Sequence, residues 1–224
     1  MENYKKGFVE FLLNAGALKF GDFTLKSGRS SPYFINIGDL NDGAALDKLG
    51  RFYAETIVHE FGKNVDALFG PAYKGIPIAV AAASKLYSEF GMNVKYVSVR
   101  KEVKDHGDKG AFLGAKLKGG ERIIIVEDVT TAGTSIRETM DTLKDLNVTV
   151  LGLVVSADRM ERGTGEKTAL AEIADTFGFK TAAIVTLDEI LEVVGGTLTK
   201  EQKEKMKAYR AEYGAKRSKK HAAG

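Results

Sequence analysis

The sequence predicts an α/β fold in which a central, mostly parallel sheet is flanked by helices. The strand candidate Arg122–Val126 carries an unbroken apolar run, as expected of a strand that is buried on both faces of a sheet. Strand candidates of this kind alternate with segments of helical periodicity, an order typical of parallel sheets. The 224 residues, 44% of them hydrophobic, suffice for one α/β domain with a sizeable core. We therefore expect a single domain over residues 1–224.

The elements are expected in the following order. Apolar residues at helical spacing predict a helix within residues 2–15. Phe23–Leu25 and Tyr33–Ile35 are predicted strands flanking the turn Lys26–Arg29. A second helix carries Leu46, Leu49, Tyr53 and Ile57 on one face. The next strands are expected at Val65–Phe69, Val94–Val99, Arg122–Val126, Val148–Val155 and Thr181–Thr186, and the next helices at Ile76–Phe90, Ser135–Leu146 and 166–177.

Two segments depart from this alternation. Residues 101–110 are charged and contain glycine, and we expect a long functional loop there, because long loops inside compact domains usually carry function. From about Lys200 the chain is rich in lysine and glutamate, which predicts a solvated terminal helix. The basic run 216–220 is interpreted as a frayed terminus.

Composition excludes several classes of function. The 33 basic and 30 acidic residues leave a net charge of +3, which demands no nucleic-acid partner. The absence of cysteine excludes disulfides, thiolate metal sites and a cysteine nucleophile. No apolar signal core follows Met1–Lys6, and no apolar run is long enough to span a bilayer, so we expect a cytoplasmic protein with no membrane partner.

The most specific motif lies at the end of the apolar strand. Glu127 and Asp128 follow this strand directly, and the Thr/Gly/Ser loop Thr130–Ser135 leads into a helix. A helix N-terminus with small residues lets a phosphate approach unpaired amides. Adjacent carboxylates suit the 2′- and 3′-hydroxyls of a ribose, directly or near a metal. The motif therefore predicts a ribose 5-phosphate site, and it lacks the signatures of a Walker A loop and of a dinucleotide site. The structural alternative is an acidic turn and a capped helix without a ligand.

Two further turns carry charged residues. Gly70–Pro77 offers backbone amides and the charge of Lys74 to a pyrophosphate, or is an ordinary strand-to-helix turn. The turn after Phe23 sets Lys26 and Arg29 beside aromatic residues, which suits a flat anionic ring, or is a surface hairpin.

Arg159 follows the predicted strand Val148–Val155. At the carboxyl end of a strand, its guanidinium is suited to clamp a carboxylate with two hydrogen bonds. The alternative is a surface arginine paired with Asp158 or Glu161.

The segment Val126–Ser135 resembles the phosphoribosyl pyrophosphate (PRPP) loop of type I phosphoribosyltransferases. Residues 23–34, 70–77, 100–107 and 156–163 narrow the resemblance to the orotate phosphoribosyltransferase family, and it runs from about Phe20 to about Arg162. It implies the type I phosphoribosyltransferase fold, with a hood formed by about residues 1–40 and C-terminal elements over a PRPP-binding core. It also implies Mg²⁺-dependent transfer of ribose 5-phosphate from PRPP to orotate in pyrimidine biosynthesis.

The resemblance implies residue roles by position. The PRPP contacts expected are Lys26, Tyr73, Lys74, Arg100, Lys101, Lys104, His106, Glu127, Asp128, Val129, Thr130, Thr131, Ala132, Gly133, Thr134 and Ser135. The orotate contacts expected are Lys26, Phe34, Ile35, Thr131 and Arg159.

The resemblance further implies a catalytic loop, a metal and an assembly. Lys101, Lys104 and His106 are the expected catalytic residues, on a loop that in the family reaches the neighbouring subunit's site in a homodimer. Mg²⁺ is expected to be held mainly through PRPP, near Glu127 and Asp128. The matching loop of the family often holds a non-proline cis peptide, and if one occurs here it is expected between Ala72 and Tyr73.

Other functions share parts of this pattern. A purine phosphoribosyltransferase would share the PRPP loop, but Lys26–Arg29, Lys101–His106 and Arg159 argue against it. A PRPP-sensing regulator that binds nucleic acid would usually add a basic surface or a DNA-binding domain, whereas this chain has balanced charge and no recognition-helix domain before residue 20. An α/β scaffold without a ligand would require four separate coincidences at strand ends.

Overall fold

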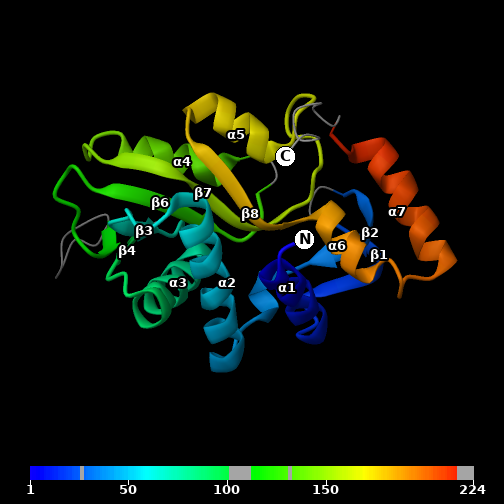
Figure 1. The fold of residues 1–224 in the computed structure, drawn as a ribbon. Helices are drawn as coiled ribbons and strands as arrows, with labels where there is room; N and C mark the ends of the chain where they lie inside the picture. Colours follow the sequence, from blue (N-terminus) through cyan, green and yellow to red (C-terminus); the bar gives the residue numbers. More distant parts are fainter. Residues whose placement is uncertain (26–27, 101–111, 131–132, 216–224) are drawn as a thin grey trace.

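The computed structural model of the protein describes residues 1–25, 28–100, 112–130 and 133–215. In this part of the chain, six strands form the main sheet in the order β5-β4-β3-β6-β7-β8, and β1 pairs with β2 in a separate hairpin (Figure 1). The strands are β1 (Leu18–Thr24), β2 (Ser30–Ile35), β3 (Ala67–Phe69), β4 (Lys95–Val99), β5 (Phe112–Gly114), β6 (Arg122–Glu127), β7 (Thr149–Asp158) and β8 (Lys180–Thr186). The helices are α1 (Asn3–Asn14), the 3₁₀ turn η1 (Ile37–Asp39), α2 (Gly43–Phe61), α3 (Gly75–Phe90), α4 (Thr134–Leu143), α5 (Ala169–Phe177), α6 (Leu187–Val194) and α7 (Lys200–Tyr213).

The main sheet is parallel except at one edge, where β5 pairs antiparallel with β4. Helices α2 and α3 cover one face and α4 and α5 the other (Figure 1). The expectation of a mostly parallel sheet flanked by helices is therefore confirmed.

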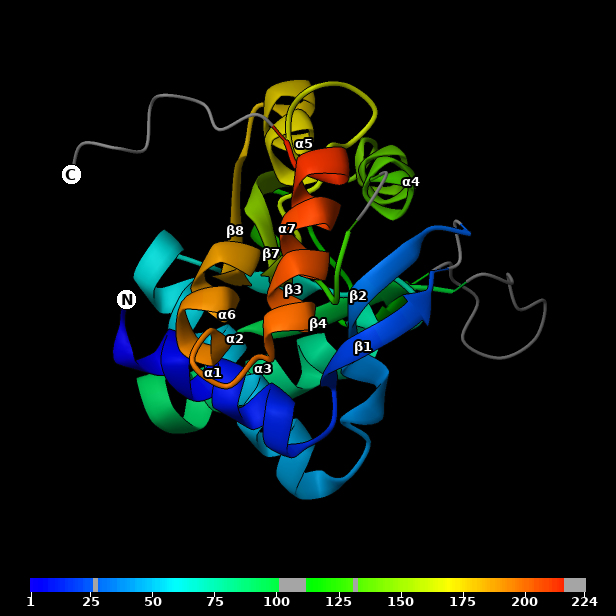
Figure 2. The ribbon, with the colours of Figure 1, turned by 90° about the vertical axis from the view of Figure 1, so that its right-hand side faces the viewer.

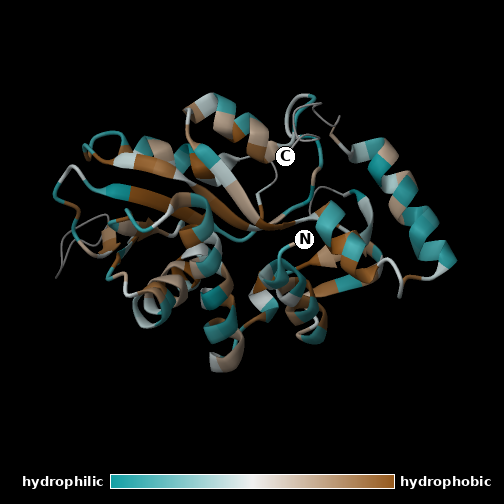
Figure 3. Cartoon of the chain, in the orientation of Figure 1, coloured by the Kyte–Doolittle hydropathy of each residue, from teal (hydrophilic) through white to brown (hydrophobic). Residues whose placement is uncertain are grey.

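Strand β6 supplies the centre of the core. Its alternate residues belong to different layers: Ile124 and Val126 pack on the side of α2 and α3, and Ile123 and Ile125 on the side of α4 and α5. All four are fully buried, and burial of each such side chain stabilises the fold by roughly 1.5–3 kcal/mol. The middle parts of the strands are accordingly mostly hydrophobic, whereas the helices carry both hydrophilic and hydrophobic residues (Figure 3).

The hairpin β1–β2 lies beside the C-terminal helix α7, with α6 and α1 next to them (Figure 2). The ring of Tyr33 in β2 meets that of Tyr209 in α7 edge-on, with centroids 6.0 Å apart. The Asp22 carboxylate of β1 pairs with Lys205 of α7 at 2.9 Å. Contacts between these elements therefore join the two ends of the chain.

The structure differs from the sequence-based expectations at three elements, α7, α6 and β5. Helix α7 is not solvated on all sides, because Met206 and Tyr209 are only 3% and 5% exposed against the rest of the fold. Helix α6 begins where a capping box between Thr186 and Glu189 stops β8, and nothing in the apolar pattern predicted this break. Strand β5 is only three residues long and was not predicted from the sequence.

No helix in the described ranges combines the length and the apolar character needed to cross a membrane.

Candidate active site

The carboxyl end of β6 forms a rigid acidic turn. The buried hydroxyl of Tyr53, from α2, donates a hydrogen bond of 2.7 Å to the carbonyl oxygen of Glu127. The backbone N–H of Ser156, from β7, donates one of 2.8 Å to the carbonyl oxygen of Asp128, and its hydroxyl donates to the same oxygen. Neighbouring elements on both sides of β6 thus fix the backbone that carries the two carboxylates.

The two carboxylates of this turn occupy different environments. Glu127 is only 8% exposed, and its Oε1 accepts a hydrogen bond of 3.0 Å from the backbone N–H of Asp128. Burial raises the pKa of Glu127 to about 7, and the neighbouring charge of Asp128 adds to the shift. Asp128 accepts at Oδ1 from the N–H of Val129 at 2.6 Å, and its Oδ2 lies 2.7 Å from Nζ of Lys74.

The turn that carries Lys74 packs tightly against the end of β6. The peptide between Ala72 and Tyr73 is cis, which confirms the expectation for this position. A Cβ atom on Gly75 would lie 2.9 Å from the carbonyl oxygen of Val126, so only glycine permits this close approach. Lys74 is thereby brought to Asp128, and it also donates to Asn36 at 3.4 Å, while the Tyr73 side chain is 69% exposed.

Helix α4 begins directly after the acidic turn. Gly133, with φ of +69°, precedes the first helical residue, Thr134, and a Cβ atom at Gly133 would lie 3.2 Å from the Ile173 side chain. Helix α4 thus begins at Thr134, one residue before the predicted start at Ser135. Thr131 and Ala132 lie outside the described residues.

A cavity of about 680 Å³ opens between the hairpin and the ends of β6 and β7. Its lining comprises Leu25, Arg29, Phe34, Ile35, Asn36, Lys74, Val129, Thr130, Asp158, Arg159, Glu161, Arg162, Gly163 and Ala169. The ring of Phe34 is stacked on that of Phe23, with centroids 5.5 Å apart, which holds one aromatic wall. Six residues expected from the sequence meet here: Phe34, Ile35, Lys74, Val129, Thr130 and Arg159.

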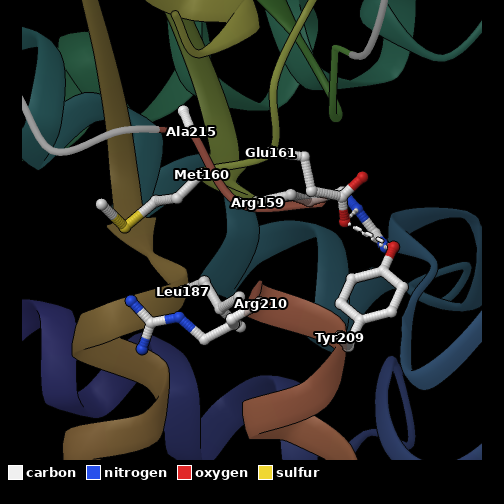
Figure 4. Close-up of a pocket in the computed structure, with 8 residues that line it drawn as sticks. Arg159, Met160, Glu161, Leu187, Tyr209, Arg210 and Ala215 are labelled. Atoms are coloured by element: carbon white, nitrogen blue, oxygen red, sulfur yellow. Dashed lines mark hydrogen bonds and ion pairs between the residues drawn. The ribbon is translucent and has the colours of Figure 1, made fainter. Parts of the chain in front are cut away.

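Arg159 combines a place in the cavity wall with an ion pair to Glu161. It lines the cavity, and it is also paired with Glu161, since its Nε donates to Oε1 at 2.8 Å. Its guanidinium carbon lies 4.4 Å from the centroid of the Tyr33 ring, and its Nη2 donates to the Tyr209 hydroxyl at 3.2 Å. Figure 4 shows the Arg159–Glu161–Tyr209 contacts from a small neighbouring pocket that shares these residues. The arginine is therefore a buried, fixed cation and not a surface one.

Other expected site residues lie elsewhere. Lys26, Lys101, Lys104 and His106 lie outside the described residues. Arg100 directly follows β4. The cavity lining described above does not include Arg100, Tyr73, Glu127, Asp128, Gly133, Thr134 or Ser135. Glu127 and Asp128 nevertheless border the cavity through Val129, the next residue, and Lys74, the ion-pair partner of Asp128.

Sequence reasoning missed three contributors to this site. Asn36 lines the cavity and accepts a hydrogen bond from Lys74. Its side chain also caps the start of η1 by accepting from the N–H of Gly38, and asparagine before a short helical turn is a signal that the sequence offers. Glu161 appeared only as a competing partner of Arg159. Tyr209 has no local signal at all, because it reaches Arg159 only through the packing of α7.

Comparison with known proteins agrees with this geometry. The sequence model of the phosphoribosyl transferase domain matches residues 36–189. The chain is 53% identical to the orotate phosphoribosyltransferase of Clostridium beijerinckii, with 96% of this chain and 100% of that protein covered. The crystal structure of the orotate phosphoribosyltransferase of Francisella tularensis is 38% identical, with a TM-score of 0.83, and the match covers 93% of this chain and 100% of that one. An adenine phosphoribosyltransferase from Thermoanaerobacter pseudethanolicus, 13% identical, shares the fold with a TM-score of 0.52 over 80% of this chain and 99% of that one.

Proposed function

The chain belongs to the orotate phosphoribosyltransferases of the phosphoribosyl transferase family, and we propose that it performs its reaction in the cavity beneath the β1–β2 hairpin. The reaction joins orotate to the ribose 5-phosphate of PRPP and releases pyrophosphate, giving orotidine 5′-phosphate for pyrimidine biosynthesis. The observation that carries this placement is the buried Arg159, which faces the same cavity as the residues beside the acidic turn of β6.

In this proposal, the ribose and its phosphate bind at the end of β6. Glu127 and Asp128 accept hydrogen bonds from the ribose hydroxyls, since both are acceptors when ionised. Residues Thr130 to Ser135 and the first turn of α4 receive the 5′-phosphate, because helix N-terminal amides and their positive potential favour an anion. The hydrogen bonds from Tyr53 and Ser156 support this assignment, since they hold the acidic turn before the substrate arrives.

The pyrophosphate is proposed to lie along the turn that carries Tyr73 and Lys74. The ammonium of Lys74 lies within the cavity lining, where a polyanion can meet it. Arg100, Lys101, Lys104 and His106 are proposed to approach the same group, and Lys104 and His106 to assist its departure. A closing loop of this kind would exclude water and strengthen every charge interaction inside the site.

Orotate is proposed to lie between Phe34, Ile35 and Arg159, with Lys26 and Thr131 as further contacts. Arg159 binds the carboxylate of orotate, since a guanidinium matches a carboxylate in shape and charge. The cavity, at about 680 Å³, has the size of a typical small-molecule site.

Mg²⁺ is proposed to be held mainly by oxygens of PRPP. In the described part of the chain, no group of three or more histidine or acidic residues forms a metal site. Glu127 and Asp128 offer carboxylate oxygens, which suit a hard cation, but Lys74 already competes for Asp128. When bound, the ion would neutralise charge on the pyrophosphate as it leaves.

The remaining parts of the proposal concern assembly and location. The resemblance of Arg100–Gly107 to a loop that serves a neighbouring subunit supports a homodimer with shared active sites. The balanced charge supports the absence of a nucleic-acid partner, and we propose a cytoplasmic location.

The direct test is to follow orotate absorbance with PRPP and Mg²⁺ present and then to omit each in turn. We expect turnover only with all three, and none with adenine or guanine in place of orotate. An Arg159→Lys variant should lose affinity for orotate while its KM for PRPP stays close to the original. If this variant kept its orotate KM, the proposed orientation of orotate would be wrong even though the chain is an orotate phosphoribosyltransferase.

A further inference from the structure

Glu161 is the centre of a buried polar cluster beside the cavity. Its Oε1 accepts hydrogen bonds from Nε of Arg159 at 2.8 Å and from the hydroxyls of Tyr209 and Tyr33 at 2.8 and 3.3 Å. Its Oε2 lies 3.8 Å from Nη1 of Arg29. Tyr33 lies in β2 and Arg29 directly before it, Arg159 directly follows β7, and Tyr209 lies in α7. This one carboxylate therefore joins the hairpin, the sheet and the C-terminal helix.

The contacts fix one particular edge of the Arg159 guanidinium. Both Nε and Nη2 of Arg159 lie 2.8 Å from Oε1 of Glu161, and Nη2 also donates to the hydroxyl of Tyr209. Among the described residues, no partner is recorded for Nη1. The ring of Tyr33 covers one face of the guanidinium, at 4.4 Å. The cluster therefore determines how the plane of the guanidinium lies and leaves a defined set of its donors for a ligand.

Burial strengthens the ion pair between Arg159 and Glu161. Arg159 and Glu161 side chains are 8% and 12% exposed, so the pair is only slightly screened by solvent. A buried arginine without its partner would be an uncompensated charge and would turn toward water. Burial also raises the pKa of Tyr209, so its hydroxyl remains a donor to Glu161 at any ordinary pH.

The charges of the cluster match a singly charged ligand group. Arg29 and Arg159 contribute two positive charges and Glu161 one negative charge, which leaves a net charge of +1 on the cluster. Asp158 and Arg162, which also line the cavity, carry opposite charges and leave this sum unchanged. One carboxylate neutralises that charge, whereas an uncharged pyrimidine of the same shape leaves it unbalanced. A cluster without Glu161 would present two mobile cations in place of one oriented cation.

We propose that Glu161 is a positioning residue for orotate, which holds Arg159 through the Nε–Nη2 edge so that its remaining donors meet the orotate carboxylate. Tyr209 and Tyr33 support Glu161 in this role, and α7 thereby takes part in the specificity of the site. The proposal rests on the role of Arg159 in orotate binding proposed above. Glu161 itself does not touch orotate.

The test compares Glu161→Gln with Arg159→Lys and with the double variant. Glutamine keeps the size of the side chain and removes its charge. We expect Glu161→Gln to raise the KM for orotate about tenfold while the KM for PRPP stays within about twofold. Because Glu161 acts through Arg159, the double variant should be little worse than Arg159→Lys alone.

Asp22→Asn is the matched control. The Asp22–Lys205 pair also joins the hairpin to α7 but has no contact with Arg159, so this variant reports loosening of α7 alone. We expect its orotate KM to match that of the unmodified protein. If Asp22→Asn raised the orotate KM as much as Glu161→Gln does, the effect would come from helix docking and the positioning role would be refuted.

The remaining outcomes separate the two proposals. An unchanged orotate KM in Glu161→Gln, with a raised one in Arg159→Lys, would overturn the role of Glu161 and leave the orotate site standing. An unchanged KM in Arg159→Lys would remove the proposed orotate site itself. If Glu161→Gln does not fold, Tyr33→Phe replaces it, since it keeps the ring over Arg159 and removes only the hydroxyl that donates to Glu161. A rise in orotate KM without a rise in PRPP KM supports the proposal, and no rise overturns it.

Discussion

The ammonium of Lys74 lies 2.7 Å from Oδ2 of Asp128, so the cation proposed for pyrophosphate is paired with an acid proposed for ribose. The Lys74 side chain is 53% exposed, and an ion pair so accessible to water contributes only about 0–1 kcal/mol. Lys74 and Asp128 can therefore give up their ion pair for other partners at a small cost in free energy. A bound PRPP can therefore take Lys74 for its phosphates and leave the Asp128 carboxylate to the ribose hydroxyls, at little cost in free energy.

Replacing Lys74 by alanine should lower kcat/KM for PRPP by about 10- to 100-fold, because a phosphate loses a charged partner worth about 1.5–3 kcal/mol. The KM for orotate should change less, since Arg159 lies on another part of the cavity wall. Steady-state kinetics with each substrate varied would measure both effects. Lys95→Ala is the control, because Lys95 forms a comparable ion pair with Glu121 away from the cavity. Equal kinetics in the two variants would remove Lys74 from the PRPP site.

Replacing Tyr53 by phenylalanine should destabilise the protein by about 1–3 kcal/mol, because it leaves the buried carbonyl oxygen of Glu127 without its 2.7 Å hydrogen bond. Burial raises the pKa of the Tyr53 hydroxyl, so the donor is present at all ordinary pH values. Urea denaturation would measure the change. The exposed Tyr87, in Tyr87→Phe, is the control and should show no loss. A Tyr53→Phe protein as stable as the original would mean that this hydrogen bond contributes nothing net.

Lys104→Ala should lower kcat much more than it weakens orotate binding. This prediction comes from the resemblance of the loop alone, since Lys104 lies outside the described residues. A cation that meets the pyrophosphate chiefly as it departs acts on the transition state, and its loss therefore appears in kcat. Single-turnover rates and equilibrium binding of orotate would separate the two effects. An unchanged kcat would exclude Lys104 from catalysis.

The sequence predicts the centre of this molecule better than its periphery. The apolar run of β6 and the Glu127–Asp128 pair behind it are local patterns, and the structure has them at the predicted place. Helix α7 shows the opposite case. Its composition, rich in lysine and glutamate, indicates solvent, and the buried face that carries Tyr209 depends on the hairpin from the other end of the chain. The local sequence could not decide whether Arg159 is a surface arginine paired with Asp158 or Glu161, or a cation placed to bind a carboxylate. Only the packing of Tyr33 and α7 shows that the Arg159–Glu161 pair is buried.

Glu127 should make the stability of the protein fall as pH rises through neutrality. Its pKa in the folded protein is about 7, above the usual value of 4.5 that applies when the chain unfolds. Between these two values the folded state binds the proton more tightly than the unfolded state, so stability is greatest below about pH 4.5 for this group and decreases until about pH 7. The total change for this group is on the order of 3 kcal/mol, at about 1.36 kcal/mol for each pKa unit. Glu127→Gln, which cannot ionise, should lack this contribution. Urea midpoints of both proteins at pH 5, 6, 7 and 8 would measure it, and the variant should gain in stability relative to the original as pH rises. Parallel curves for the two proteins would show that Glu127 does not titrate in this range.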